Sequence, residues 1–343
     1  MSMEMTSRER VLSALKGDSV DRIPVISSVS LANSECMKLT KCFYPNVCLN
    51  ASRIATLAET SYTELKFDSI MPYFGTLNEA GSLGCDIIWG NGEHPSIFFK
   101  SVLRDPDDFQ PPRNYLDAKP LKAIITAISM LKSKHGGNAA LIGKIIGPLS
   151  IIFYLYGIQN TLNCLILTPQ KIINLLKETE KLCASFALAQ IEAGVDIMTI
   201  SEDAAGFFIS RECYKKTVMD IERNLMLQIQ KYVPVIFHLS GKITDRVDLF
   251  RDTGFDALSF DSRNNLNKLK ADSGNMKLVG GVNIPMVLLN GKPEDVTADV
   301  YNALAHGVDI ISPEGAVHPR ITSKNLITIS EAVRKYEKIH SYR

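Results

Sequence analysis

The sequence predicts an α/β protein of the (β/α)₈ TIM-barrel type. Eight apolar runs with strand composition recur along the 343 residues, and amphipathic segments with helical spacing lie between them. Strands that are apolar throughout and alternate with helices indicate a parallel sheet covered on both faces. Eight such units suit a closed barrel. A doubly wound open sheet is the competing arrangement, but no G-x-G-x-x-G motif follows the first run, which weakens its dinucleotide-binding form.

Local signals mark the first helix and the strands. Thr6 and Glu9 form a capping-box pattern that opens a helix through about Lys16, and Gly17 ends it. The next run predicts a strand over residues 23–28. The other predicted strands cover residues 67–74, 139–147, 195–203, 233–241, 255–261, 276–283 and 308–315.

Two of the connecting segments have well-marked helix ends. Residues 168–194 place apolar side chains at helical spacing and finish at Gly194. Residues 292–307 have Pro293 near the start and Gly307 at the end, the usual frame of a helix.

We expect one barrel domain over residues 1–343, because low-complexity segments and internal repeats are absent. Residues 1–65 and 90–138 are expected to add helices and loops to the barrel. The second of these is polar and contains several prolines, so it is expected to cross the surface.

Composition limits the class of partner. The chain has 38 basic and 37 acidic side chains, so no nucleic-acid partner is expected, and a small molecule or another protein is favoured. The longest apolar region, residues 141–159, is broken by Lys144, Gly147 and Pro148, so no membrane span is predicted. There is no signal-peptide pattern at the start, and the seven cysteines include no C-x-x-C pair, so a cytoplasmic protein with free thiols is expected.

Polar side chains collect at the carboxyl ends of the predicted strands, where a parallel barrel has its active site. Several have a structural alternative: Asp203 as a helix cap, Asp261 as a turn residue, Glu314 as a solvated loop charge and His318 as an exposed residue. The full set is Tyr73, Glu79, Ser201, Glu202, Asp203, His238, Ser240, Asp261, Asn283, Glu314 and His318.

His238 is the strongest functional candidate, because it ends an apolar strand and precedes a glycine turn. A neutral imidazole serves as a general base near pH 7 or as a metal ligand, and a structural histidine is the alternative. Glu202 and His238, with Glu314 or His318, are a possible zinc set. The sequence has no H-E-x-x-H motif, and spacing alone does not choose between these roles.

Several segments resemble the uroporphyrinogen decarboxylase-like superfamily, and within it the corrinoid-dependent methyltransferases of the methylcobamide:coenzyme M type. They are RERVLSALKGDSVDRIPV (8–25), NEAGSLGCDIIWG (78–90), SEDAAGFFISRECY (201–214), HLSG (238–241) and LLNGKPEDVTADVYNALAHGVDIISPEGAVHP (288–319). The resemblance implies a (β/α)₈ barrel whose mouth docks a corrinoid protein carrying methylcobalamin.

The chain departs from two patterns of this superfamily. Thiol-methylating members bind zinc through a His-x-Cys pair and a later cysteine, and the metal lowers the pKa of the acceptor thiol. Here His238 matches, but Ser240 and about Gly315 replace the two cysteines, so zinc binding is in question. True uroporphyrinogen decarboxylases carry an arginine-rich segment after the first strand. Residues 27–34, SSVSLANS, contain no arginine, so porphyrinogen decarboxylation is not expected.

Other members use glutamates after the fourth strand and a histidine after the fifth. Glu202 and His238 fit the outer positions of that set, whereas Glu212 and Glu222 have no clear register in it. A methyl donor of ether or amine type suits this chain better than thiol methylation, and a folate acceptor is also possible.

We therefore predict a methyltransferase that moves a methyl group between a corrinoid protein and a small molecule. The alternatives are a decarboxylase-like lyase of the same fold and a non-catalytic relative that binds a corrinoid protein. The predicted roles are catalytic for His238, Glu202 and Asp203, metal-binding for His238, Glu202 and Glu314, and cofactor-binding for Tyr73, Asp261 and Asn283.

Overall fold

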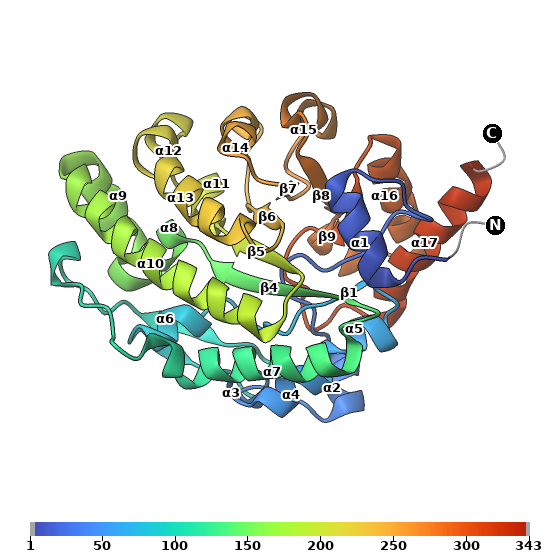
Figure 1. Cartoon of the computed structure of the whole chain (residues 1–343), viewed down its shortest axis with the longest axis horizontal. Coiled ribbons are helices and arrows are strands. Elements are labelled where there is room, and N and C mark those ends of the chain that lie inside the picture. The colour runs from blue at the N-terminus through green and yellow to red at the C-terminus, as the bar shows by residue number, and fades with distance from the viewer. Residues whose placement is uncertain (1–3, 341–343) are drawn as a thin grey trace.

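A curled parallel sheet forms the centre of the molecule, with helices outside it (Figure 1). The computed structural model describes residues 4–340. Seven strands follow one another in the order β1-β4-β5-β6-β7-β8-β9, and each neighbouring pair is parallel. This confirms the predicted α/β barrel class. The strands are β1 (Ser69–Ile70), β4 (Ala140–Ile146), β5 (Ile197–Ser201), β6 (Val235–His238), β7 (Ala257–Ser259), β8 (Lys277–Val282) and β9 (Ile310–Pro313).

Helices cover the outside of the sheet and fill the connections between strands. The predicted first helix is present, and its capping box joins Thr6 and Glu9 as expected. The α-helices are α1 (Ser7–Lys16), α2 (Ser34–Thr40), α3 (Asn46–Leu49), α4 (Ala51–Ala58), α5 (Thr60–Thr63), α6 (Asn78–Ser82), α7 (Lys119–His135), α8 (Pro148–Tyr156), α9 (Ile158–Leu167), α10 (Pro169–Ala193), α11 (Asp203–Phe207), α12 (Arg211–Thr217), α13 (Met219–Gln230), α14 (Val247–Thr253), α15 (Leu266–Ser273), α16 (Pro293–Ala305) and α17 (Ser323–His340). Short turns of other helix types are η1 (Pro106–Asp108), η2 (Tyr115–Asp117) and η3 (Ile284–Leu288).

The predicted first strand, residues 23–28, is reduced to one parallel bridge between Val25 and Ile311. The segment still closes the ring, because Ile26 N donates to Ile311 O at 2.9 Å and Asp68 N donates to Val25 O at 2.7 Å. Side chains take the place of further ladder bonds: the Asp68 carboxylate accepts from Val25 N, and Ser69 Oγ accepts from Ser27 N. Pro24 has no N–H to offer. The eighth position of the barrel is therefore filled by extended chain that does not form a regular strand.

A two-stranded antiparallel hairpin, β2 (Asp86–Ile88) with β3 (Ile97–Lys100), lies outside the parallel sheet. This hairpin was not predicted from the sequence. Its apolar runs, residues 87–88 and 97–99, are shorter than those of most barrel strands, and most of the hairpin residues are exposed.

The register of the strands places polar side chains at two successive levels of the barrel. His238 pairs with Ser201 on β5 and with Ser259 on β7, which defines the upper level. Lys144 on β4 pairs with Thr199 on β5, and Thr199 precedes Ser201 by two residues. This pair defines the lower level. Because side chains alternate with period two, all five point to the same face of the sheet.

Within residues 4–340, no single helix has the length and apolar character needed to cross a membrane. The helices α8 and α9 pass that test only as a pair, on length and composition, and they meet at a bend of 109°.

We propose that the chain is a single domain, as the sequence predicts. One cluster of buried apolar side chains supports this, since it runs from Val11 on α1 to Val333 on α17.

Candidate active site

His238 is the last residue of β6, and its side chain is 1% exposed. Burial lowers the pKa of His238 to about 4, and the nearby positive charge of Lys144 acts in the same direction. The charges of Asp203 and Asp261 oppose this shift. The imidazole is therefore neutral at pH 7 and offers one nitrogen lone pair.

A chain of serine hydroxyls decides which nitrogen of His238 carries the proton. Nδ1 of His238 lies 2.9 Å from Ser259 Oγ. Ser28 Oγ comes next in the chain, at 3.0 Å from Ser259 Oγ and 3.2 Å from Ser312 Oγ. Ser312 Oγ donates its proton to Pro313 O at 2.9 Å. Each hydroxyl has one proton to donate, and that of Ser312 is already used. All four contacts are therefore satisfied only if Ser28 donates to Ser312 and Ser259 donates to Ser28. Nδ1–H of His238 must then donate to Ser259. The lone pair is thus on Nε2.

Ser28 is hydrogen-bonded to residues of β7 and β9, which are not neighbours in the sheet. A side chain can meet both strands only across the interior of the barrel. The face shared by His238, Ser201, Ser259, Lys144 and Thr199 is therefore the inner face.

Asp203 and Ser240 lie beside Nε2 of His238. Ser240 Oγ donates to Asp203 Oδ1 at 2.9 Å, and Nε2 is 3.5 Å from Ser240 Oγ and 3.8 Å from Asp203 Oδ1. The Asp203 side chain is 37% exposed, so it connects the buried imidazole to solvent. These three residues form a group that can accept a proton, and two of them were predicted as catalytic from the sequence.

Glu202 is directed to a different place. Its carboxylate accepts hydrogen bonds from Leu149 N at 3.0 Å, from Ser150 N at 2.8 Å and from Ser150 Oγ, all in the first turn of α8. It packs over Gly147, where a Cβ atom would stand 2.2 Å from Oε2. Among the hydrogen bonds of residues 4–340, the one that joins Glu202 to His238 is between backbone atoms, Glu202 N to His238 O at 2.8 Å.

Glu222 on α13 is the buried neighbour of Glu202. Its Oε2 accepts from the Tyr214 hydroxyl, and its Oε1 has no hydrogen-bond partner within the described residues. Burial raises the pKa of Glu202 to about 7, and the charge of Asp203 also raises it. Burial and then the charge of Glu202 raise the pKa of Glu222 well above its usual value. The two carboxyls therefore compete for a proton.

Replacing Glu222 with glutamine is expected to stabilise the protein at alkaline pH. In wild type the folded state holds protons that the unfolded chain releases, because the folded pKa of Glu222 lies well above 4.5 and that of Glu202 is about 7. The substitution removes the contribution of Glu222. Stability therefore falls as pH rises through this window. At pH 8 the free energy of unfolding of the variant is expected to exceed that of wild type by about 1–3 kcal/mol. Near pH 4.5 this difference should vanish. Urea unfolding across this pH range measures it.

Glu212→Gln is the matched control, because Glu212 lies on the exposed side of α12. It is expected to leave the pH dependence unchanged. A Glu222→Gln protein that is less stable than wild type at pH 8 would contradict the account of two competing carboxyls.

Glu314, predicted as a metal ligand, joins two loops at the mouth. Its Oε2 accepts from Ser262 N at 2.5 Å, and its Oε1 accepts from Ile284 N at 3.0 Å. It thereby connects the chain after β7 to the chain after β8. The role of Glu314 as a metal ligand remains a prediction.

The residues predicted to bind a cofactor have structural contacts of their own. Asp261 Oδ2 accepts from Gly241 N at 2.7 Å, which holds the turn after His238, where Gly241 has a φ of 94°. Asn283 caps η3 by accepting from Met286 N at 2.7 Å. Tyr73 is buried and donates to Glu79. Their predicted cofactor contacts remain predictions.

Two further sequence candidates differ in exposure. Glu79 is buried, and its Oε1 accepts from Ile146 N at 2.9 Å. His318 is exposed, and its Nδ1 accepts from Arg320 N at 3.2 Å.

The donor set around His238 does not match a zinc site. Nowhere in residues 4–340 do three or more His, Cys, Asp or Glu side chains gather as a metal site would need. The side-chain groups beside Nε2 are one carboxylate and one hydroxyl, and a neutral hydroxyl is a poor zinc ligand. Gly315 offers no ligand, although a Cβ atom there would meet only Ile284 Cδ1, at 3.9 Å. We therefore assign no chemical step to zinc.

Lys144 and the serines at positions 28, 259 and 312 were not predicted from the sequence as members of the inner face. The signal for Lys144 was present, since a lysine within an apolar strand is rarely buried without a reason. The serines gave no such signal, because each is a common residue in turns and at strand ends.

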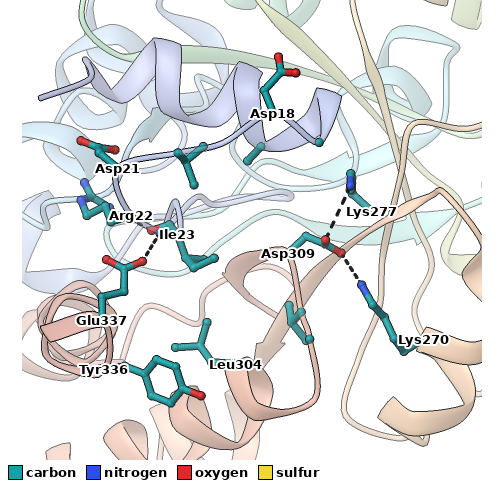
Figure 2. Close-up of a pocket in the computed structure, with 15 residues that line it drawn as sticks. Asp18, Asp21, Arg22, Ile23, Lys270, Lys277, Leu304, Asp309, Tyr336 and Glu337 are labelled. Atoms are coloured by element: carbon teal, nitrogen blue, oxygen red, sulfur yellow. Dashed lines mark hydrogen bonds and ion pairs between the residues drawn. The ribbon is translucent and has the colours of Figure 1, made fainter. Parts of the chain in front are cut away.

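A surface pocket lies at the opposite end of the barrel, near the start of β8 and β9 (Figure 2). Several of its charged groups have hydrogen-bond or ion-pair partners. Lys270 Nζ donates to Asp309 Oδ2 at 3.2 Å, and Lys277 Nζ lies 3.9 Å from Asp309 Oδ1 (Figure 2). Glu337 accepts from Ile23 N (Figure 2). In TIM barrels this end contributes to stability, so the mouth at His238 is the candidate site.

The fold and the site define a TIM-barrel protein with buried polar groups at the carboxyl ends of its strands. More specifically, the chain belongs to the uroporphyrinogen decarboxylase (URO-D) family, whose sequence profile matches residues 6–336. The resemblance found in the sequence is thus confirmed at the level of the family.

Similar proteins include methyltransferases that match the chain almost from end to end. The methylcobamide:CoM methyltransferase MtbA of Methanosarcina mazei is 28% identical over 97% of this chain and 99% of its own length. A uroporphyrinogen decarboxylase from Wolbachia is 24% identical over 74% of each chain. A solved structure of a methyltransferase from Methanosarcina mazei superimposes with a TM-score of 0.92, at 22% identity, over 97% of this chain and 99% of that one. This superposition supports the barrel fold described above.

Proposed function

We propose that this protein is a corrinoid-dependent methyltransferase that moves a methyl group between a methylated cobamide and a small molecule held in the barrel. The cobamide is a substrate carried by a partner protein. The sequence alone favours an ether or amine donor over a thiol. We nevertheless propose a thiol acceptor, because the relatives that match over their full length are named for transfer from methylcobamide to CoM. The cytoplasmic location expected from the sequence remains a prediction.

The observation that carries the proposal is the open lone pair of His238 Nε2 beside Asp203 and Ser240. Transfer to a thiol forms a carbon–sulfur bond and breaks the methyl–cobalt bond, with both electrons staying on cobalt. The thiol proton must leave. Nε2 of His238 is placed to accept it, and the exposed carboxylate of Asp203 can pass it to solvent.

The rim of the mouth is suited to a protein partner. Phe207 ends α11 and is 50% exposed, Phe208 follows it and is 44% exposed, and Met286 on η3 is 71% exposed. Both elements follow carboxyl ends of strands, β5 and β8. Exposed apolar side chains gathered at one end of a barrel are typical of a protein interface.

Replacing Phe207 with alanine is expected to raise the KM for a methylated corrinoid protein by roughly tenfold, because aromatic side chains contribute strongly to interfaces. The rate with free methylcobalamin should stay unchanged. Tyr232→Ala is the control, since Tyr232 is 64% exposed and precedes β6 at the other end of the barrel. An equal loss with free methylcobalamin would contradict a docking role.

The function is tested by offering purified protein free methylcobalamin with thiol, amine and folate acceptors, and by mass spectrometry of the products. A methylated acceptor is expected. If no methyl acceptor or donor reacts, and the protein instead releases carbon dioxide from an acidic substrate, the lyase alternative replaces the proposal.

A further inference from the structure

Lys144 is a buried cation that the proposed reaction does not use. It sits in the middle of β4, its side chain is 0% exposed, and its Nζ has no hydrogen-bond partner among residues 4–340. Its contact is with an aromatic ring, as Nζ lies 4.7 Å from the ring centroid of Tyr73. An ammonium group needs three acceptors when it leaves water, so leaving all three protons unbonded is costly.

The carboxylates near Lys144 do not complete its coordination. Glu79 is engaged by the Tyr73 hydroxyl and by Ile146 N, and Asp203 is engaged by Ser240. Burial lowers the pKa of Lys144. The charges of Asp203 and Glu79 raise this pKa, and neither carboxylate is hydrogen-bonded to the amine within the described residues. The amine is therefore held in a site where a further negative group would be favourable.

Two neighbouring hydroxyls share the same lack of partners. Thr199 Oγ1 and Ser201 Oγ on β5 are buried and have no hydrogen-bond partner in the described part of the chain. Thr199 is the register partner of Lys144, and Ser201 is the register partner of His238. The three unpaired groups therefore lie on adjacent strands of the inner face, next to and just below the level of His238.

Buried polar groups are almost always paired, so three unpaired ones side by side indicate a missing ligand. One cation with two hydroxyl donors suits an anion that has several oxygens. We propose that Lys144, Thr199 and Ser201 bind the anionic end group, a sulfonate or a carboxylate, of the small molecule whose heteroatom exchanges the methyl group beside His238. This assignment of substrate class rests on the proposed function.

The first test measures binding without chemistry. Ethanesulfonate and propionate are titrated calorimetrically into wild type, Lys144→Met and Thr199→Val. Lys144→Met removes the charge and keeps most of the length of the side chain, so it is expected to fold, which thermal unfolding checks. Wild type should bind one or both anions, and Lys144→Met should bind them at least about tenfold more weakly. Lys277→Met at the other end of the barrel is the matched control and should bind as wild type does.

The second test separates this inference from the proposed function. 2-Mercaptoethanesulfonate, 3-mercaptopropionate and the uncharged 2-mercaptoethanol are compared as methyl acceptors. Wild type should have a lower KM for an anionic thiol than for 2-mercaptoethanol. Lys144→Met should lose that preference while it still methylates 2-mercaptoethanol.

If wild type methylates all three thiols with equal KM, the anion site is wrong and the methyltransferase proposal stands. If no thiol is methylated but Lys144-dependent anion binding persists, the methyltransferase proposal fails and the anion site stands. If wild type binds neither anion, the anion site is overturned.

Discussion

Replacing His238 with alanine is expected to lower the rate of methyl transfer by about 10²–10⁴-fold. The imidazole is held neutral by burial, and the serine chain directs its lone pair on Nε2 toward Asp203 and Ser240. Alanine removes the group placed to receive the acceptor's proton. Because the loss concerns the chemical step, it should appear in kcat and leave the KM of the small molecule little changed.

Two further variants test how His238 works. Ser259→Ala removes the hydroxyl that receives the Nδ1 proton, so it should change the tautomer seen by ¹⁵N NMR and lower kcat less than His238→Ala does. His318→Ala is the control, because His318 is exposed and should be dispensable. If His238→Ala retains full activity, the histidine is structural and the proposed site is wrong.

Introducing two cysteines beside His238 is expected to increase zinc binding strongly. The double variant Ser240→Cys/Gly315→Cys would set two thiolates with His238, the ligand set of the thiol-methylating relatives described from the sequence. Position 315 has room for a side chain, since a Cβ atom there meets only Ile284 Cδ1 at 3.9 Å. Metal analysis after dialysis should find about one zinc per chain in the double variant and far less in wild type.

The single variants are the controls for this gain. Ser240→Cys and Gly315→Cys each supply one thiolate, so each should bind zinc much more weakly than the double variant. Adding His238→Ala to the double variant should lower its zinc content again. A double variant with no more zinc than wild type would show that these positions do not converge on His238.

The barrel could be predicted from the sequence because its strands lie in mostly apolar runs and segments with helical spacing separate many of them. The prediction that residues 23–28 form a full strand was wrong, because Asp68 and Ser69 occupy its amide groups through their side chains. Such bonds join residues more than 40 positions apart. Periodicity within one segment contains no information about them.

The candidate site could be predicted only in part. His238, Asp203 and Ser240 are brought together because two adjacent strands end beside each other. The sequence could not show that Glu202 would bond to the first turn of α8, or that Lys144 would have no hydrogen-bond partner within the part of the chain that the structure describes. Both depend on where each side chain points once the barrel closes.

The most direct test of the central claim follows a methyl group labelled with deuterium on methylcobalamin. Purified wild type and His238→Ala are each mixed with this donor and 2-mercaptoethanesulfonate in a single turnover, and the thiol is analysed by mass spectrometry. We predict that wild type transfers the labelled methyl to sulfur and that His238→Ala does so at least about 10²-fold more slowly. Equal rates for the two proteins, or label that stays on the cobamide with wild type, would contradict the account.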